Sequence, residues 1–172
     1  MSEISLRGCK MHTCGELPTT GSIMPDFTVC NTELAPVSLQ DFKNHPLIIH
    51  TFPSLDTQVC YECTLEIEQE AKRCCQFKSL AISMDLPFAL KRIIHHEKLD
   101  QTLFLSDFRT REFSVKTGLL IEDGILAGLL TRSLIILDKH HRIIHQQLIT
   151  QLEQQPDINL AIKVIQQLEQ KP

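Results

Sequence analysis

The stretch that decides the fold runs from Leu47 to Cys63 and reads LIIHTFPSLDTQVCYEC. Its first six residues, 47–52, form an apolar run of the kind found in buried strands, and Pro53 ends that run. A polar loop follows, and the spacing of apolar residues from about 57 to 75 predicts a helix. A buried strand that leads through a short loop into a helix is typical of α/β proteins.

The rest of the chain continues this alternation. A short N-terminal hairpin is expected, with Gly8 near its turn and strands at 4–7 and 10–14. The other strands are expected at 26–30, 79–84, 102–106, 133–137 and 142–149, and the other helices at 87–98, 109–118 and from 156 onward. We therefore predict a single α/β domain over residues 1–172, with a central mixed sheet flanked by helices and an N-terminal β-hairpin.

The composition excludes several classes of function. The 172 residues are 42% hydrophobic, which is enough to bury a full core without disulfides or a structural metal. The net charge is −4, no basic run is present, and the chain has one Tyr and no Trp, so we expect no nucleic-acid partner. No segment approaches the roughly 20 apolar residues that cross a bilayer, so we expect no membrane association. Residues 1–15 carry no signal-peptide pattern, which indicates a cytoplasmic protein.

The cysteines point to reactive thiols rather than to a disulfide framework. Their number is odd, and the chain carries no secretion signal, so a reducing compartment is expected. The seven are Cys9, Cys14, Cys30, Cys60, Cys63, Cys74 and Cys75. A zinc site would need two more ligands at suitable spacing beside a C-x-x-C pair, and the adjacent cysteine and histidine pairs at 74–75, 95–96 and 140–141 do not provide that spacing. We therefore expect no metal site.

Cys60 falls in the first turn of the predicted helix after residue 57. The first turn of a helix presents unpaired backbone N–H groups and a partial positive charge, and both favour a thiolate over a thiol. The thiolate is the nucleophilic form of cysteine. Thr57, three residues earlier, is placed to direct its hydroxyl at the same volume, where it could accept a hydrogen bond from a hydroperoxide and donate one to the sulfur.

Cys63 has two readings. With Cys60 it forms a C-x-x-C motif, which in a thioredoxin-like protein would act as a dithiol. It also shares the i, i+4 spacing of an apolar helical stripe, Val59, Cys63, Ile67 and Ala71, in which it would be a small core residue.

The site sequence resembles the thiol peroxidase group of the peroxiredoxins. The family pattern Pro-x-x-x-Thr-x-x-Cys stands here as Pro53, Thr57 and Cys60, and its longer form matches from Phe52 through Cys60. Further matching stretches lie at 24–28, 83–89 and 126–138, and the N-terminal hairpin and last helix are in register. The resemblance thus covers nearly the whole chain.

The resemblance implies a thioredoxin-like fold and the reduction of hydrogen peroxide and organic hydroperoxides without metal or cofactor. Cys60 would attack the peroxide and become a sulfenic acid. The family's active-site arginine maps to Arg132, whose charge would hold Cys60 as thiolate and polarise the O–O bond. Pro53 would shield the sulfenic acid from water. The family also implies a homodimer and a thiol reductant, thioredoxin where a disulfide forms.

The chain departs from the family at the position of the second cysteine. Most members carry a resolving cysteine in the helix after Asp-Leu-Pro-Phe-Ala, and the matching position here is Ile94. Three routes then remain for reducing Cys60. Cys63 could attack after the helix unwinds locally; another cysteine could serve, among Cys9, Cys14, Cys30, Cys74 and Cys75; or an external thiol could act on Cys60 directly.

Two other functions compete with a peroxidase. A dithiol–disulfide oxidoreductase would use Cys60 and Cys63, but it leaves Thr57 and Arg132 unexplained. A redox sensor on a peroxidase scaffold would explain the missing resolving cysteine, although Pro53, Thr57, Cys60 and Arg132 are all retained.

Overall fold

The structure is a computed structural model that describes residues 1–74 and 77–168. Its strands are β1 (Glu3–Leu6), β2 (Cys9–His12), β3 (Thr28–Asn31), β4 (Pro36–Ser38), β5 (Leu47–Thr51), β6 (Lys78–Ser83), β7 (Thr102–Ser106), β8 (Ser133–Leu137) and β9 (Ile143–Leu148). Its α-helices are α1 (Gln58–Arg73), α2 (Pro87–Glu97), α3 (Glu112–Lys116) and α4 (Ile158–Leu168), and two short 3-10 helices are η1 (Leu39–Phe42) and η2 (Gly124–Leu126). Within these residues no helix has the length and apolar character needed to cross a membrane.

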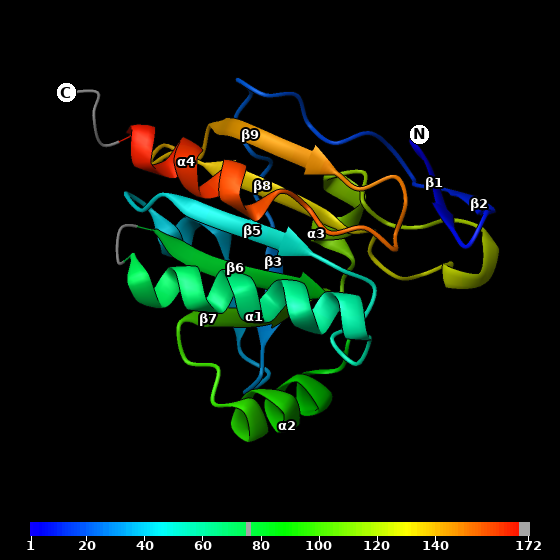
Figure 1. Ribbon diagram of the computed structural model, residues 1–172, viewed down its shortest axis with the longest axis horizontal. Helices are drawn as coiled ribbons and strands as arrows, with labels where there is room; N and C mark the ends of the chain where they lie inside the picture. Colours follow the sequence, from blue (N-terminus) through cyan, green and yellow to red (C-terminus); the bar gives the residue numbers. More distant parts are fainter. Residues whose placement is uncertain (75–76, 169–172) are drawn as a thin grey trace.

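Seven strands form one mixed sheet in the order β4-β3-β7-β6-β5-β8-β9 (Figure 1). The central pairs β5–β6 and β6–β7 are parallel, and every other pair is antiparallel. The predicted mixed sheet flanked by helices is confirmed. Strand β5, which begins the stretch 47–63, lies between β6 and β8. Its five buried residues match this central position in the sheet.

The two faces of the sheet are covered by different helices. Along β5 the side chains alternate: Ile48 packs with the cluster that α1 and α4 contribute, whereas Leu47 and Ile49 pack on the other face with Phe113 of α3. Figure 1 shows α1 and α4 on one side of the sheet and α3 behind it. The α1 side is the one that carries the site.

Helix α1 is placed by the end of β5. The chain leaves the sheet at Pro53, and Thr57 is the extended residue just before the helix. Cys63, Ile67 and Ala71 are buried along the helix, as the apolar stripe predicts. Cys60 therefore lies in the first turn of α1, beside the carboxyl ends of the central parallel strands.

The N-terminal hairpin is a separate two-stranded sheet that packs against the main body (Figure 1). Arg7 and Gly8 form its turn with φ values of 49° and 80°, the left-handed conformation that two-residue hairpin turns require. Its inner face carries Ile4 and Met11, which are fully buried in a small cluster with Ile121 and Leu152. This hairpin was predicted, with strands at 4–7 and 10–14. The observed strands begin one residue earlier and end one or two residues earlier than predicted.

Three details differ from the sequence prediction. The short strand β4 and both 3-10 helices were not expected. The helix expected over 109–118 is only α3, because the preceding residue, Arg111, adopts a left-handed conformation (φ 56°), and the buried Asp107 carboxylate accepts the backbone N–H groups of Phe113 and Ser114. The helix expected to reach residue 75 ends at Arg73, and Cys75 lies outside the described residues.

Candidate active site

Cys60 is buried, with 1% of its surface exposed, although it lies at the start of a helix. Phe52 and Leu55, from the segment before α1, belong to the apolar cluster around it. The first N–H groups of α1 have no partner within the helix and give this end a partial positive charge. A sulfur placed here is kept from bulk water and faces a positive helix end.

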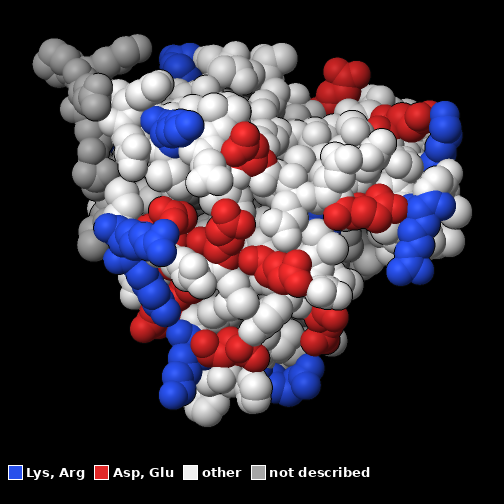
Figure 2. Space-filling model, viewed as in Figure 1, with Lys and Arg blue, Asp and Glu red and all other residues white. Residues whose placement is uncertain are grey.

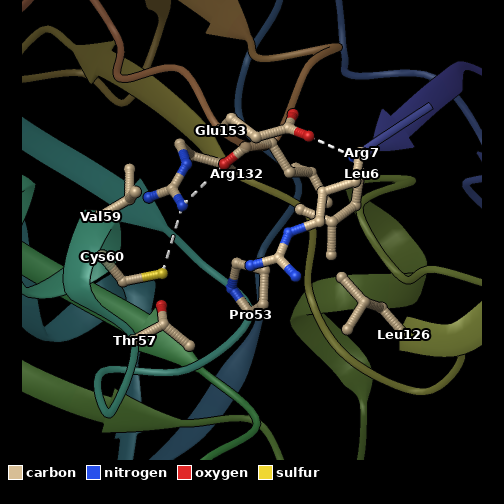
Figure 3. A pocket seen from close by; sticks show the side chains of 10 residues that line it. Leu6, Arg7, Pro53, Thr57, Val59, Cys60, Leu126, Arg132 and Glu153 are labelled. Carbon is tan, nitrogen blue, oxygen red and sulfur yellow. Dashed lines mark hydrogen bonds between the residues drawn. The ribbon is translucent and has the colours of Figure 1, made fainter. Parts of the chain in front are cut away.

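Arg132 brings a full positive charge to the same sulfur. It precedes β8, whose first residue, Ser133, pairs with Thr51 at the end of β5. Arg132 is 3% exposed, and its Nη2 donates to the Cys60 Sγ at 3.3 Å and to the Leu152 carbonyl oxygen at 3.2 Å (Figure 3). Its Nε and Nη1 are buried without a hydrogen-bond partner in the described part of the chain. These two groups are unpaired donors of the same guanidinium that contacts the sulfur.

Thr57 and Pro53 form the near wall of a cavity of about 260 Å³ beside Cys60. The Thr57 hydroxyl donates to the Ser54 carbonyl oxygen at 3.0 Å. Its proton is therefore used locally, and its oxygen is left to accept. The predicted donation from Thr57 to the sulfur is not observed, whereas its predicted capacity to accept a hydrogen bond remains.

The far wall of this cavity comes from segments distant in sequence. Leu6 and Arg7 of the hairpin lie across the cavity from Cys60, and Leu126, Leu152 and Glu153 complete the wall (Figure 3). The Glu153 carboxylate accepts the backbone N–H of Arg7 and so ties the hairpin to the segment after β9. Sequence reasoning missed these residues, because no motif or periodicity marks them.

Comparisons with known proteins agree with this arrangement. Residues 19–162 match the Redoxin protein family. A thiol peroxidase of Corynebacterium glutamicum is 34% identical over 165 residues, which cover 96% of this chain and 99% of that protein. The chain belongs to the thiol peroxidase group of the peroxiredoxins.

Other relatives extend this agreement. The Mycobacterium tuberculosis thiol peroxidase is 32% identical over 96% of this chain and 99% of its own length. A solved structure of a peroxiredoxin-like protein from Aquifex aeolicus superposes with a TM-score of 0.91 at 28% identity and covers 98% of both chains. A thiol peroxidase from Chromobacterium violaceum has the same fold, with a TM-score of 0.92 at 22% identity over 99% of this chain and 98% of its own. The predicted thioredoxin-like peroxiredoxin fold is confirmed.

Cys63, the other cysteine of the C-x-x-C motif, points into the protein. It is 3% exposed and packs with Ile48 and Ile67 between α1 and the sheet. Burial raises the pKa of its thiol to about 12, and the nearby charge of Arg132 only partly opposes this. In the intact helix Cys63 is thus a protonated core thiol.

Ile94, the position at which the family resemblance predicts a resolving cysteine, lies on α2 and packs partly buried against the apolar cluster that contains Cys60. The α2 position therefore retains a contact with the site but has no sulfur.

A buried polar chain also reaches Cys60 from the sheet. The Thr64 hydroxyl donates to the Cys60 carbonyl oxygen at 2.8 Å, and His50 Nε2 lies 3.3 Å from the same hydroxyl oxygen. Burial, followed by the positive charge of Arg132, lowers the pKa of His50 to about 3, so its ring is neutral at ordinary pH. No motif marks His50, which lies within an otherwise apolar strand, so sequence reasoning missed it. It fixes the first turn of α1 to β5.

Across residues 1–74 and 77–168 no three His, Cys, Asp or Glu side chains gather in a way that could hold a metal ion. On the face shown in Figure 2, acidic and basic side chains are interspersed rather than collected into a basic area.

Proposed function

We propose that this protein is a thiol-dependent peroxidase that reduces hydrogen peroxide and organic hydroperoxides, with Cys60 as the peroxide-attacking cysteine. The observation that carries the proposal is the 3.3 Å contact between the buried Arg132 guanidinium and the Cys60 sulfur, at the base of a cavity open to substrate. A buried cation beside a thiol at a helix start stabilises the thiolate, which is the reacting form.

The chemistry follows from the groups around the sulfur. The Cys60 thiolate attacks the terminal peroxide oxygen, an S–O bond forms, and the O–O bond breaks. The leaving alkoxide or hydroxide takes a proton and departs as alcohol or water, and Cys60 becomes a sulfenic acid. The unpartnered Nε and Nη1 of Arg132 are placed to stabilise the developing negative charge, and the Thr57 oxygen to accept a hydrogen bond from the peroxide.

The walls of the cavity bear on substrate and product. Pro53 and Val59 on the near side and Leu6, Leu126 and Leu152 on the far side offer apolar surface around the sulfur. About 260 Å³ exceeds what hydrogen peroxide needs, so the cavity also accommodates the alkyl group of an organic hydroperoxide. Pro53 is buried and limits the access of water to a sulfenic acid on Cys60.

Several further properties are part of the proposal, and of these only the dimer and the reductant come from the family. We expect a single domain over residues 1–172, a cytoplasmic homodimer, and reduction by thioredoxin or another thiol. Analytical ultracentrifugation of the purified protein tests the dimer, and turnover with thioredoxin against turnover with a small dithiol tests the reductant.

A dithiol oxidoreductase using Cys60 and Cys63 is less well supported. Such an enzyme needs two thiols that alternate between reduced and disulfide forms at an accessible helix start. Cys63 instead faces the core with a pKa of about 12. A redox sensor would keep a reactive Cys60 but would not consume peroxide catalytically.

The deciding experiment measures peroxide consumption with thioredoxin, thioredoxin reductase and NADPH, and separately with dithiothreitol. The expected result is sustained turnover by the wild-type protein and none by Cys60→Ser. Stoichiometric oxidation without turnover would favour the sensor, and insulin reduction without peroxide consumption would favour the oxidoreductase.

A further inference from the structure

Peroxide reduction on Cys60 leaves a sulfenic acid that some thiol has to remove, and the structure separates the cysteines it describes. Cys63 is buried beneath α1, and Cys30 is buried in β3. Cys74 follows the far end of α1, about 20 Å along the helix from Cys60. Cys14 is half-buried, and its thiol donates to the Ser114 carbonyl oxygen at 3.7 Å. Among the described cysteines only Cys60 lines its cavity, and none of these four lies on β1 or β2, the hairpin beside the far wall.

Cys9 differs because it lies on the hairpin that forms the far wall of the cavity. It is exposed, and it is the direct cross-strand partner of Leu6, which lines the cavity. Paired residues of an antiparallel sheet point to the same face, so Cys9 shares the face of Leu6. The residues two further along each strand, Ile4 and Met11, are buried on this same face against the body.

Arg132 supplies the polar group nearest to Cys60 in a cavity whose other walls are mainly apolar. Arg132 is 3% exposed, and its Nε and Nη1 have no partner within the described residues. Figure 3 shows its guanidinium beside the Cys60 sulfur, with the hairpin residues Leu6 and Arg7 across the cavity. A sulfenate on Cys60 would therefore be held by Arg132 and would face Leu6 and Arg7, the hairpin residues next to Cys9.

We propose that Cys9 is the resolving cysteine of this enzyme and that it forms an intramolecular disulfide with Cys60. The inference rests on the proposed peroxidase function. The Cys9 thiolate attacks the Cys60 sulfur, an S–S bond forms, the S–O bond breaks, and the oxygen leaves as water after taking protons. Cys60 thereby loses its sulfenic oxygen, Cys9 is oxidised, and thioredoxin or another dithiol returns both to thiols.

The reaction requires a local opening, and the structure indicates which side opens. A disulfide needs Cα atoms about 4.4–6.8 Å apart, whereas Cys60 lines the cavity and Cys9 lies outside it, next to Leu6 of the far wall. The hairpin is fixed by backbone bonds from Ser5 to Thr150 and from Leu152 to Ser5. The first turn of α1, whose leading N–H groups lack partners within the helix, is held by the hydrogen bonds from Tyr61 N to the Thr57 oxygen and from the Thr64 hydroxyl to the Cys60 oxygen. Unwinding that turn moves Cys60 toward Cys9.

The test is peptide mapping under non-reducing conditions after one equivalent of peroxide, with thioredoxin-driven turnover measured in parallel. The expected result for the wild-type protein is a Cys9–Cys60 disulfide within one chain. In Cys9→Ser, peroxide still oxidises Cys60 at the wild-type rate, dimedone traps a sulfenic acid there, and thioredoxin-driven turnover falls at least about tenfold. Cys14→Ser, the matched control just after β2, behaves as wild type.

Other outcomes overturn the inference. These are a Cys60–Cys63 disulfide, a sulfenic acid as the sole wild-type product, a Cys9–Cys60 link found only between two chains, or full turnover by Cys9→Ser. Because Cys9 is exposed, the substitution should not disturb folding, and Cys9→Ala together with a circular dichroism spectrum checks this. If the wild-type protein consumed no peroxide, the proposed function itself would fail, which is a separate result.

Discussion

At the scale of single residues, the contact between Arg132 and the Cys60 sulfur is the one on which we expect the reaction with peroxide to depend. Replacing Arg132 by Gln keeps a polar side chain but removes the charge that faces Cys60 at 3.3 Å. We expect the second-order rate constant for peroxide to fall about 10²–10³-fold, as when one preorganised stabilising group is removed from an active site. Stopped-flow kinetics on the reduced protein measures this. Arg109→Gln, an exposed arginine outside the Cys60 cavity, should change the constant less than twofold.

Thr57 tests whether an accepting oxygen matters. Thr57→Val keeps the shape and removes the hydroxyl, whereas Thr57→Ser retains it. We expect the peroxide rate constant to fall about 10- to 100-fold in the Val variant and to stay within about threefold in the Ser variant, since a hydrogen bond to a charged or polarised group contributes about 1.5–3 kcal/mol. Equal rates for Val and Ser would mean that Thr57 only shapes the loop.

The residues of the site differ in how far the sequence could predict them. Three of them, Pro53, Thr57 and Cys60, lie within eight residues of one another. Their place was predictable because the sequence there indicates a buried strand, a short loop and the first turn of a helix. Arg132 lies 72 residues after Cys60 and was found only through the family pattern. The far wall at Leu6 and Leu152 could not be predicted, because it depends on how the hairpin packs on the segment after β9.

At the scale of the element, α1 holds two cysteines in different surroundings: Cys60 contacts Arg132 and lines the cavity, whereas Cys63 packs in the core. With a pKa of about 12, the Cys63 thiol is ionised in roughly one molecule in 10⁴ at pH 8. We therefore expect iodoacetamide to leave Cys63 unmodified in the native reduced protein at pH 8 and to modify it fully in denaturant. Differential alkylation followed by mass spectrometry measures both. Rapid native labelling of Cys63 would show that α1 opens readily and would restore it as a resolving candidate.

The elements were predictable where periodicity was strong. The expected strands at 102–106 and 133–137 match β7 and β8 to the residue. The three-residue β4 was missed because it is short and begins with Pro36, a residue that strand patterns disfavour. Helix α3 is shorter than predicted because its start is set by Arg111 in a left-handed conformation, a tertiary effect.

At the scale of the whole molecule, the neutral His50 in the core should make stability sensitive to acid. Its folded pKa of about 3 lies below the ordinary 6.5, so between these values the unfolded chain binds the extra proton. Stability is therefore lost as the pH falls from about 6.5 toward 3, by at most about 1.4 kcal/mol for each pH unit from this group. Urea denaturation between pH 7 and pH 4 measures the slope.

The matched variant separates His50 from the carboxylates that also titrate in this range. His50→Asn removes the titrating ring and keeps a polar group in reach of Thr64. Its stability should change less steeply with pH than that of the wild type between pH 6.5 and pH 4. Identical slopes would mean that His50 does not stay neutral in the folded protein.

The central claim is that peroxide oxidises the sulfur of Cys60 and that Arg132 activates this sulfur. The most direct measurement mixes fully reduced protein with one equivalent of hydroperoxide, without reductant and with dimedone present, and maps the oxidised residue by mass spectrometry. In Cys9→Ser, where the sulfenic acid persists, the account predicts one peroxide consumed per chain and dimedone on Cys60 alone. Oxidation at any other cysteine, or peroxide loss at the wild-type rate in Cys60→Ser, would contradict it.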